Sequence, residues 1–346
     1  MSQTKPAGAF NMTSTFDSTE EAWRAMVRSV AECGDRVPGV HDPLSIGSKF
    51  GDSARDTREL IAAQIAIRNP RARLIVSEVR PFRLDFAIAQ VIWALSGSDE
   101  LAPLAFYHHR GAEFSDNGST VRSAIGRRVF RSRNGDQMHE AVDKIRNDRS
   151  TRRAMIQIYL PDDLFLPSRD ISCTGSLHLL ARGSQLHAVG QMRSQSTTVV
   201  LPYDLFLLTM LHEFASVCAG LELGTYWHVC NSAHIYEDEM HFTKALVDEQ
   251  STAVQPMPAM PESAASEIAE LIEAERMVRH SLIKTETKLD VRSLSLSTYW
   301  QDLLETMIAD WKLRHGYSWA DAGIDNLPEL YQRALATADR DSVNLT

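Results

Sequence analysis

One acidic side chain, Asp204, stands inside the apolar stretch LPYDLF at residues 201–206. A carboxylate in apolar surroundings costs several kcal/mol unless it is paired, hydrogen-bonded or neutralised. Asp204 could serve as the N-cap of a helix that begins at Leu205, which is a common position for aspartate. It could also recognise a polar ligand in a closed site. The stretch by itself leaves both roles open, and they do not exclude each other.

The elements that position this acid follow from hydrophobic spacing and turn residues. An apolar helix is expected over 205–221, closed by Gly220, and a hairpin over 176–194 precedes it, with Gly183 in its turn. Three further helices and two strand segments are expected: helices over 18–33, 86–95 and 136–148, a strand over 154–160, and a strand that leads into a helix over 225–246. Strands and helices therefore alternate on both sides of Asp204.

Composition excludes several classes of function. The chain has 346 residues, of which 44% are hydrophobic and 23% charged, as in soluble globular proteins. A net charge of −9 argues against general nucleic-acid binding. No apolar run is long enough for a membrane helix, and the N-terminus lacks a signal-peptide core. The four cysteines form no CxxC pair, so we expect free thiols in a reducing cytoplasm and no metal site.

Motifs spread over about 150 positions resemble thymidylate synthase and its relatives, the pyrimidine-nucleotide C5 hydroxymethylases. They are IWALSG (92–97), DQM followed by STRRAMIQIY (136–159), ISCTGSLHL (171–179), QMRS (191–194), LPYDLF (201–206) and SAHIY (232–236). Their order and spacing follow the family. The resemblance implies an α+β fold with a large bent mixed sheet that packs against its twofold mate.

Three parts of the chain are expected on this basis. Residues 1–44 form an N-terminal segment with one helix, and residues 45–250 form the thymidylate synthase-like catalytic domain. The stretch VQPMPAMPESAAS begins at residue 254 and is typical of a Pro-rich linker. Residues 251–346 are therefore expected to be a linker and a lobe of amphipathic helices, which covers the site or extends the interface.

The resemblance implies that Cys173 is a nucleophile that adds to C6 of the pyrimidine. This addition makes C5 an enamine-like nucleophile, and nearby arginine charge lowers the pKa of such a thiol. Arg152, Arg153 and Arg193, with Ser194, match the family's phosphate site, because guanidinium groups suit phosphate geometry. In the family the paired arginines reach across from the other subunit. The resemblance thus implies an obligate homodimer with shared sites.

Other motifs match the sugar and the base. His234 and Tyr236 correspond to the pair that hydrogen-bonds the sugar 3′ hydroxyl, and alternation puts both on one face of a strand. Where thymidylate synthase has an asparagine that reads O4 and N3–H of uracil, this chain has Asp204, as do relatives that act on cytidine nucleotides. A carboxyl group pairs with the amino group and N3 of cytosine, and a mismatched base is rejected by roughly 10⁴. The resemblance favours Asp204 as the selector of cytosine.

Several positions depart from the family pattern. Gln90 replaces the family's catalytic glutamate, and its amide keeps hydrogen bonds but cannot titrate. Substitute proton carriers could be Asp99, Glu100, His108 or His109, unless the alignment is one turn off or the folate step has changed.

The folate side of the site departs as well. Ser196 replaces an aspartate that helps to hold the folate, Ile125 replaces a tyrosine, and Phe114 stands where a tryptophan is expected. Trp93, in the IW pair, and Ser196 are assigned to the cofactor side. A fourth phosphate arginine of the family is matched by Lys49 or Arg55, and the sequence does not decide between them.

Three functions remain in view. The leading one is C5 hydroxymethylation of CMP or dCMP with 5,10-methylenetetrahydrofolate and water, similar to the phage dCMP hydroxymethylases and the CMP hydroxymethylase of mildiomycin-type antibiotic pathways. The second is a methylase of the thymidylate synthase type, which would form dihydrofolate. The third is a folate-independent enzyme or nucleotide-binding protein on the same fold, which the residues at positions 90, 125 and 196 favour.

Overall fold

The computed structural model describes residues 14–40, 55–168, 170–250, 255–284 and 289–337. Within these residues eight strands form one mixed sheet in the order β1-β3-β8-β6-β5-β4, with β2 beside β3 and β7 beside β8. The strands are β1 (Thr15–Phe16), β2 (Asp35–Val40), β3 (Arg55–Ile67), β4 (Met155–Gln157), β5 (Thr174–Arg182), β6 (Gln185–Met192), β7 (Gln195–Ser196) and β8 (Glu222–Tyr236). Strand β8 pairs antiparallel with β3 and parallel with β6 and β7. The fold is α+β, as predicted.

The predicted hairpin is formed by β5 and β6. Gly183 adopts a φ of 60° in its turn, a left-handed conformation that favours glycine. Buried and partly exposed side chains alternate along β8 up to Cys230 and again from Ala233. The pairing of β8 with β3 skips Ala62, which has a φ of 57°. The register of the two strands is the same on both sides of Ala62, so β8 stays paired with β3 over most of its length.

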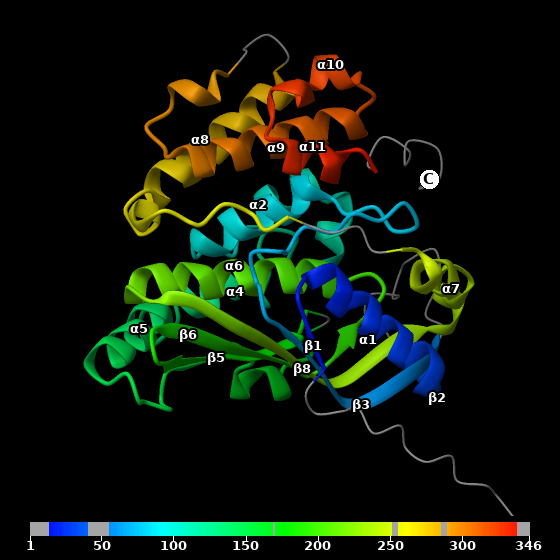
Figure 1. Cartoon of the computed structure of the whole chain (residues 1–346). Coiled ribbons are helices and arrows are strands. Elements are labelled where there is room, and N and C mark those ends of the chain that lie inside the picture. The colour runs from blue at the N-terminus through cyan, green and yellow to red at the C-terminus, as the bar shows by residue number, and fades with distance from the viewer. Residues whose placement is uncertain (1–13, 41–54, 169, 251–254, 285–288, 338–346) are drawn as a thin grey trace, which may run out of the picture.

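Helices lie in layers over one side of the sheet (Figure 1). They are α1 (Thr19–Cys33), α2 (Leu84–Leu95), α3 (Leu101–Tyr107), α4 (Ile125–Phe130), α5 (Gln137–Asn147), α6 (Leu201–Ala219), α7 (Met240–Asp248), α8 (Ile268–Ile283), α9 (Thr298–Arg314), α10 (Trp319–Ala322) and α11 (Glu329–Leu335). Short 3-10 turns are η2 (His109–Phe114), η3 (Pro161–Leu164), η4 (Glu237–Glu239), η5 (Glu262–Ala265), η6 (Val291–Ser293) and η7 (Ile324–Asn326). None of the described helices combines the length and the apolar character that a membrane span requires.

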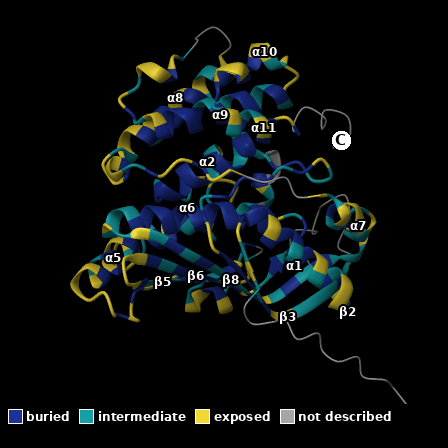
Figure 2. Cartoon of the chain, viewed as in Figure 1, coloured by how far each residue is buried: buried dark blue, intermediate teal, exposed yellow. Residues whose placement is uncertain are grey.

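Helix α6 is buried nearly all round, and Figure 2 shows it dark along its length. It begins at Leu201, with Val200 as its cap and Pro202 in its first turn, and it ends at Gly220 with a φ of 65°. The expected start at Leu205 is therefore wrong, and so is the role of Asp204 as an N-cap. Proline fits the first turn because its missing N–H has no partner there in any helix. Asp204 must be explained by other contacts.

The C-terminal helices pack on α2 (Figure 1), and α9 also reaches α6, where the hydroxyl of Tyr299 lies 3.5 Å from the sulfur of Met210. One continuous hydrophobic cluster joins the sheet, α2, α6, α8 and α9. Asp85 at the start of α2 is fully buried, where its backbone N–H donates to Asp310 of α9 at 2.9 Å. Helix α4 also lies against α2, because Gly126 has no side chain: an added Cβ would stand 2.1 Å from the oxygen of Ala94. The domain boundaries at residues 44 and 250 stay predictions.

Glu213 of α6 ties this helix to two other segments. It accepts hydrogen bonds from Arg73 at 2.5 Å, Arg71 at 2.6 Å and the backbone of Met260 at 3.0 Å. Burial opposes its ionisation, but Arg73 and these bonds outweigh burial and hold the pKa of Glu213 below its ordinary value. Arg73 is fully buried as well, so the pair must stay matched.

Replacing Glu213 with glutamine is expected to destabilise the protein by about 3–5 kcal/mol, because it leaves the buried guanidinium of Arg73 without its counter-charge. Thermal unfolding measures the effect, and Glu270→Gln on the exposed face of α8 is the control. A Glu213→Gln protein that melts together with the wild type would contradict this account of α6.

Candidate active site

Cys173 lies directly before β5, and its thiol is exposed. Arg193, at the end of the neighbouring strand β6, places its Nη2 at 3.8 Å from the sulfur. The guanidinium of Arg193 is held by the carbonyl oxygens of Ser172 at 2.8 Å and Ile171 at 3.0 Å. The backbone N–H of Arg193 also donates to the carbonyl of Cys173 at 2.8 Å. A fixed cation beside an exposed thiol is the environment of a reactive cysteine.

The paired arginines lie elsewhere on the sheet. Arg152 and Arg153 are exposed at the entry to β4, which is the edge strand beside β5. His178 of β5 contacts the carbonyl of Arg152 at 3.1 Å and fixes this turn. Ser194 follows Arg193 and is half-buried. The structure thus places Arg193 at the thiol and leaves the other two guanidinium groups at the surface, where a second molecule can meet them.

His234 and Tyr236 lie on the same face of β8, as predicted, with ring centroids 5.2 Å apart. Arg55, at the start of β3, stacks over the ring of Tyr236 at 3.6 Å. Its guanidinium also pairs with Asp238 at 2.5 Å and Glu239 at 3.6 Å. Of the two candidates for a fourth phosphate arginine, Arg55 is therefore beside the sugar-side pair, and Lys49 lies outside the described residues.

Asp204 is buried, with 9% of its surface exposed. Its Oδ2 accepts a hydrogen bond from Gln195 Nε2 at 2.8 Å. Burial raises the pKa of Asp204 to about 6, and the bond from Gln195 only partly opposes this shift. In the described chain, Gln195 is the only side chain recorded as a donor to this carboxyl group. Oδ2 of Asp204 is thus engaged, and no hydrogen bond to Oδ1 is seen among the described residues.

Gln195 connects Asp204 to two residues of β8. Its Oε1 lies 3.1 Å from Nε2 of His228, and Nδ1 of His228 lies 2.9 Å from the hydroxyl of Tyr226. Both β8 residues are fully buried, and burial lowers the pKa of His228 to about 3. Sequence analysis missed Gln195, His228 and Tyr226. Two polar residues at inward positions of a buried strand were the available signal.

Among the buried polar atoms that lack a hydrogen-bond partner in the described residues, two belong to residues 90 and 196. They are Oε1 of Gln90 on α2 and Oγ of Ser196 on β7. Ser196 is the register partner of His234, so its hydroxyl belongs to the same part of the sheet. A buried acceptor or hydroxyl without a partner costs about 1–3 kcal/mol, which a ligand can recover. The catalytic role of Gln90 and the assignment of Ser196 to the cofactor stay predictions.

Trp93 is placed differently from its neighbour Gln90. Its ring is packed in a small hydrophobic cluster with Leu101, Leu104, Val121 and Ala124. Its indole N–H donates to the carbonyl of Glu100 at 3.0 Å. Its contacts are thus those of a residue that supports the loop after α2, and its assignment to the cofactor stays a prediction.

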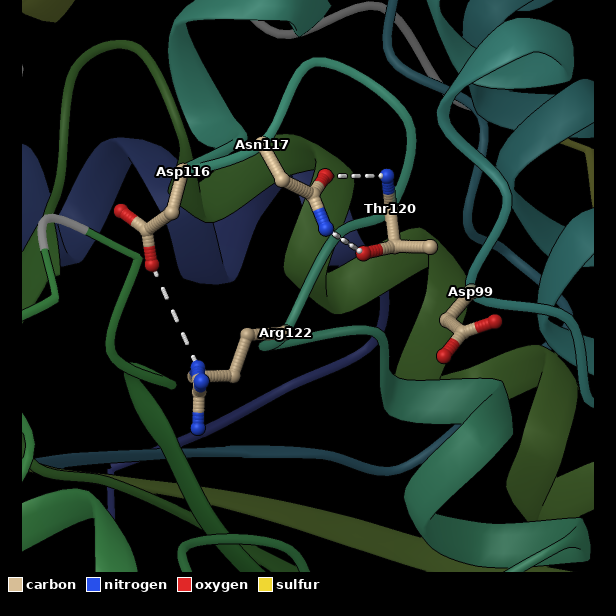
Figure 3. Close-up of a pocket in the computed structure, with 5 residues that line it drawn as sticks. All are labelled: Asp99, Asp116, Asn117, Thr120 and Arg122. Atoms are coloured by element: carbon tan, nitrogen blue, oxygen red, sulfur yellow. Dashed lines mark hydrogen bonds and ion pairs between the residues drawn. The ribbon is translucent and has the colours of Figure 1, made fainter.

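A polar pocket of about 260 Å³ lies between Asp99 and the loop at residues 116–122 (Figure 3). It is lined by Asp99, Asp116, Asn117, Thr120 and Arg122. Asp116 and Arg122 lie 4.0 Å apart across it, and the hydroxyl of Ser168 donates to Asp116 at 2.5 Å. The structure therefore places Asp99, one of the four alternatives to a catalytic glutamate, in this pocket.

The other three alternatives have structural surroundings of their own. Glu100 caps α3, and His108 packs against the ring of Phe86 with centroids 4.9 Å apart. The side chains of His109 and Phe114 lie outside what the structure describes. Ile125 begins α4. The described residues also contain no group of three or more His, Cys, Asp or Glu side chains that could hold a metal.

The buried acid predicts a pH-dependent stability. Asp204 has a pKa of about 6 in the folded protein against 3.8 ordinarily, so folded protein holds a proton between these values that unfolded protein releases. Stability from this group therefore falls as pH rises from about 4 to 6, and the loss above pH 6 is about 3 kcal/mol. Asp204→Asn is expected to melt several degrees higher than the wild type at pH 8 and equally at pH 4. Equal melting at both pH values would contradict the buried, unpaired acid.

Similarity to known proteins agrees with this geometry. The thymidylate synthase family model matches residues 47–278. Deoxyuridylate hydroxymethyltransferase of Bacillus phage SP01 is 26% identical over 215 residues, which are 57% of this chain and 56% of the phage protein. The corresponding protein of Delftia phage PhiW-14 is also 26% identical, over 49% of this chain and 51% of its own. The chain thus spans about half the length of these phage relatives.

Longer matches come from thymidylate synthases. The enzyme of Fusobacterium nucleatum is 22% identical over 66% of this chain and 82% of its own length. Thermostable thymidylate synthase A from Bacillus subtilis shares the fold, with a TM-score of 0.56 at 18% identity over 68% of this chain and 86% of that one. Because the family model covers well over half of the sequence, the chain belongs to the thymidylate synthase family.

Proposed function

We propose that this protein transfers a hydroxymethyl group to C5 of CMP or dCMP, with 5,10-methylenetetrahydrofolate and water as co-reactants. The observation that carries the proposal is Asp204, a buried carboxyl group whose Oδ2 accepts from Gln195 and whose Oδ1 has no hydrogen bond among the described residues. Cytosine has a basic N3 beside an amino donor, so a carboxyl group and N3 can share one proton while the amino group donates to the carboxyl. Uracil has no basic nitrogen at N3 to hold that proton.

The remaining residues have roles that their positions support. Cys173 is the nucleophile that adds to C6, and the guanidinium of Arg193 at 3.8 Å favours its thiolate form. Arg193 and Ser194 hold the phosphate, and His234 and Tyr236 hold the sugar. The folate supplies a one-carbon unit at the oxidation level of formaldehyde. Ser196 holds it, and Gln90 takes the position of the family's catalytic glutamate. Each of the two side chains has a buried polar atom without a partner among the described residues.

A homodimer with shared sites is part of the proposal. Arg152 and Arg153 are exposed on the edge of the sheet, and in this family such a pair serves the site of the other subunit. One face of the sheet also carries half-buried apolar side chains, among them Val189 and Trp227. All four cysteines are free thiols, which fits the reducing cytoplasm as the compartment.

Mixed dimers test the shared site. Chains that carry Cys173→Ser and chains that carry Arg152→Ala are each expected to be inactive, and their mixture is expected to recover activity. Random reassociation gives mixed dimers with one intact site, so about a quarter of the wild-type activity is expected. A mixture of Cys173→Ser with Cys173→Ala is the control and should stay inactive. No recovery after demonstrated subunit exchange would contradict the shared arrangement.

A second candidate is hydroxymethylation of deoxyuridylate. The names of the phage relatives favour it, since these proteins are deoxyuridylate hydroxymethyltransferases at 26% identity. Asp204 could read uracil only as a carboxylic acid that donates to O4 and accepts from N3–H. Its pKa of about 6 leaves the ionised form dominant at neutral pH, which is why we favour cytosine.

The product distinguishes these functions. The protein is incubated with methylenetetrahydrofolate and CMP, dCMP or dUMP, and each nucleotide is then analysed by mass spectrometry. A gain of CH₂O on a cytidine nucleotide without formation of dihydrofolate is the expected result. A gain of CH₂ with dihydrofolate would indicate a methylase, and a gain of CH₂O on dUMP alone would indicate the second candidate. Binding without any product would leave a nucleotide-binding protein.

A further inference from the structure

The contacts behind Asp204 lead to an inference that rests on the proposed function and deepens it. We propose that Gln195, His228 and Tyr226 are positioning residues that fix one oxygen of Asp204 as an acceptor and turn its other oxygen toward the base. The discrimination between bases would then depend on residues that never touch the substrate. The support comes from the direction of the three hydrogen bonds and from the burial of every member.

The donor and acceptor of each hydrogen bond follow from the chemistry of Asp204. An ionised carboxylate only accepts hydrogen bonds, so the group of Gln195 that faces Asp204 at 2.8 Å must be its amide nitrogen. The amide oxygen of Gln195 therefore faces His228, and Nε2 at 3.1 Å must carry the imidazole proton. Nδ1 is left as an acceptor, and the hydroxyl of Tyr226 at 2.9 Å is its donor. All three bonds point toward Asp204.

Burial keeps this arrangement in one state. Gln195 is 1% exposed, and His228 and Tyr226 are completely buried, so water does not compete for these groups. Burial also keeps His228 neutral, because its pKa is about 3. A neutral imidazole donates from one nitrogen and accepts at the other, so the donor of each of the three hydrogen bonds is fixed. An imidazolium would donate from both nitrogens. The three hydrogen bonds therefore have a single consistent assignment of donors and acceptors at neutral pH.

The three residues are held by different parts of the fold. Tyr226 and His228 are two apart on β8 and face α6, Gln195 lies on β7, and Asp204 is in the first turn of α6. The hydroxyl of Tyr226 sits over Gly190 of β6, where an added Cβ would be only 2.2 Å away. The glycine thus provides the space that the last donor of the chain occupies. The position of Asp204 is set by the sheet and not by its own helix alone.

The test compares two equally buried histidines. His228→Leu removes the middle of the hydrogen-bonded network, and His212→Leu is the control. His212 is fully buried on α6, and its hydrogen bond among the described residues goes to the carbonyl of Leu186 at 2.8 Å. Its ring lies beside that of Tyr226, with centroids 6.2 Å apart, but it does not bond to the Tyr226 hydroxyl. Tyr226→Phe is a milder variant that removes a single hydroxyl. Calorimetric titration with CMP and UMP, or with dCMP and dUMP, gives the ratio of the two dissociation constants for each protein without need of folate.

The preference for cytosine is expected to fall about tenfold in His228→Leu and about threefold in Tyr226→Phe, and to stay at the wild-type value in His212→Leu. An unchanged ratio in both His228→Leu and Tyr226→Phe, or an equal fall in His212→Leu, would overturn the proposed positioning role of these residues. If the wild type prefers uracil and His228→Leu loses that preference, the positioning role is supported but the proposed substrate is overturned. A wild type without any preference would overturn both.

Discussion

Replacing Asp204 with asparagine is expected to turn a cytosine-selective site into a uracil-selective one. With its oxygen held by the N–H of Gln195, the amide can accept from N3–H and donate to O4 of uracil. In the same orientation it would set its oxygen against the unprotonated N3 of cytosine and its NH2 against the cytosine amino group. Buried polar groups left unpaired by the wrong base reject it strongly, so the ratio of kcat/KM for cytidine over uridine nucleotides should fall on the order of 10³-fold. Gln195 can still donate to the new amide oxygen, so β7 and α6 should keep their positions.

A matched control separates base selection from the general effect of a buried acid. Asp310 of α9 is fully buried and, like Asp204, has its pKa raised by burial to about 6. It lies in the C-terminal helices against α2, where it pairs with Arg314 at 3.0 Å. Asp310→Asn is therefore expected to change stability but not the preference for a base. The account of Asp204 is wrong if Asp204→Asn keeps the wild-type ratio or if both variants change it alike.

The second large effect concerns the nucleophile. Cys173→Ser should lower exchange of the C5 proton by at least about 10³-fold, because a serine hydroxyl without an adjacent general base is a far weaker nucleophile than a thiolate. Nucleotide binding should stay within a few-fold of the wild type, since Arg193 is held by carbonyl oxygens and not by the sulfur alone. The assay follows proton exchange at C5 in parallel with titration of the nucleotide.

Cys33→Ser is the control for this substitution, because Cys33 is a second exposed free cysteine, at the end of α1. It should exchange the C5 proton at the wild-type rate. Retained exchange in Cys173→Ser would exclude addition of this sulfur to C6. Loss of nucleotide binding in the same variant would instead indicate that the cysteine supports the pocket.

Much of the fold could be predicted because local signals agree with tertiary packing. Gly183 and Gly220 mark a turn and a helix end, and both adopt the left-handed conformation there. The start of α6 was misplaced by four residues, although Pro202 is typical of a first helical turn. Hydrophobic spacing predicts which face of a C-terminal helix is buried, but it does not name α2 as the partner.

The site was predicted in part for the same reason. Motif order placed Cys173 next to Arg193, and alternation placed His234 beside Tyr236, since both relations are local to neighbouring strands. The contact of Asp204 with Gln195 joins a helix to a strand, and the link to His228 crosses 33 positions of sequence. Nothing in the periodicity of either segment specifies such a bond. The packing of Trp93 beneath the loop after α2 was missed for the same reason, because periodicity does not specify contacts between separate segments.

The most direct test of the account is release of tritium from C5-labelled CMP, dCMP and dUMP, each with and without methylenetetrahydrofolate. Release requires addition of a thiolate at C6 and loss of the C5 proton, so it reports Cys173 and Asp204 together. The account predicts release from a cytidine nucleotide and not from dUMP, and its dependence on folate reports the one-carbon step. Release from dUMP alone, or no release from a protein that still binds CMP, would contradict it.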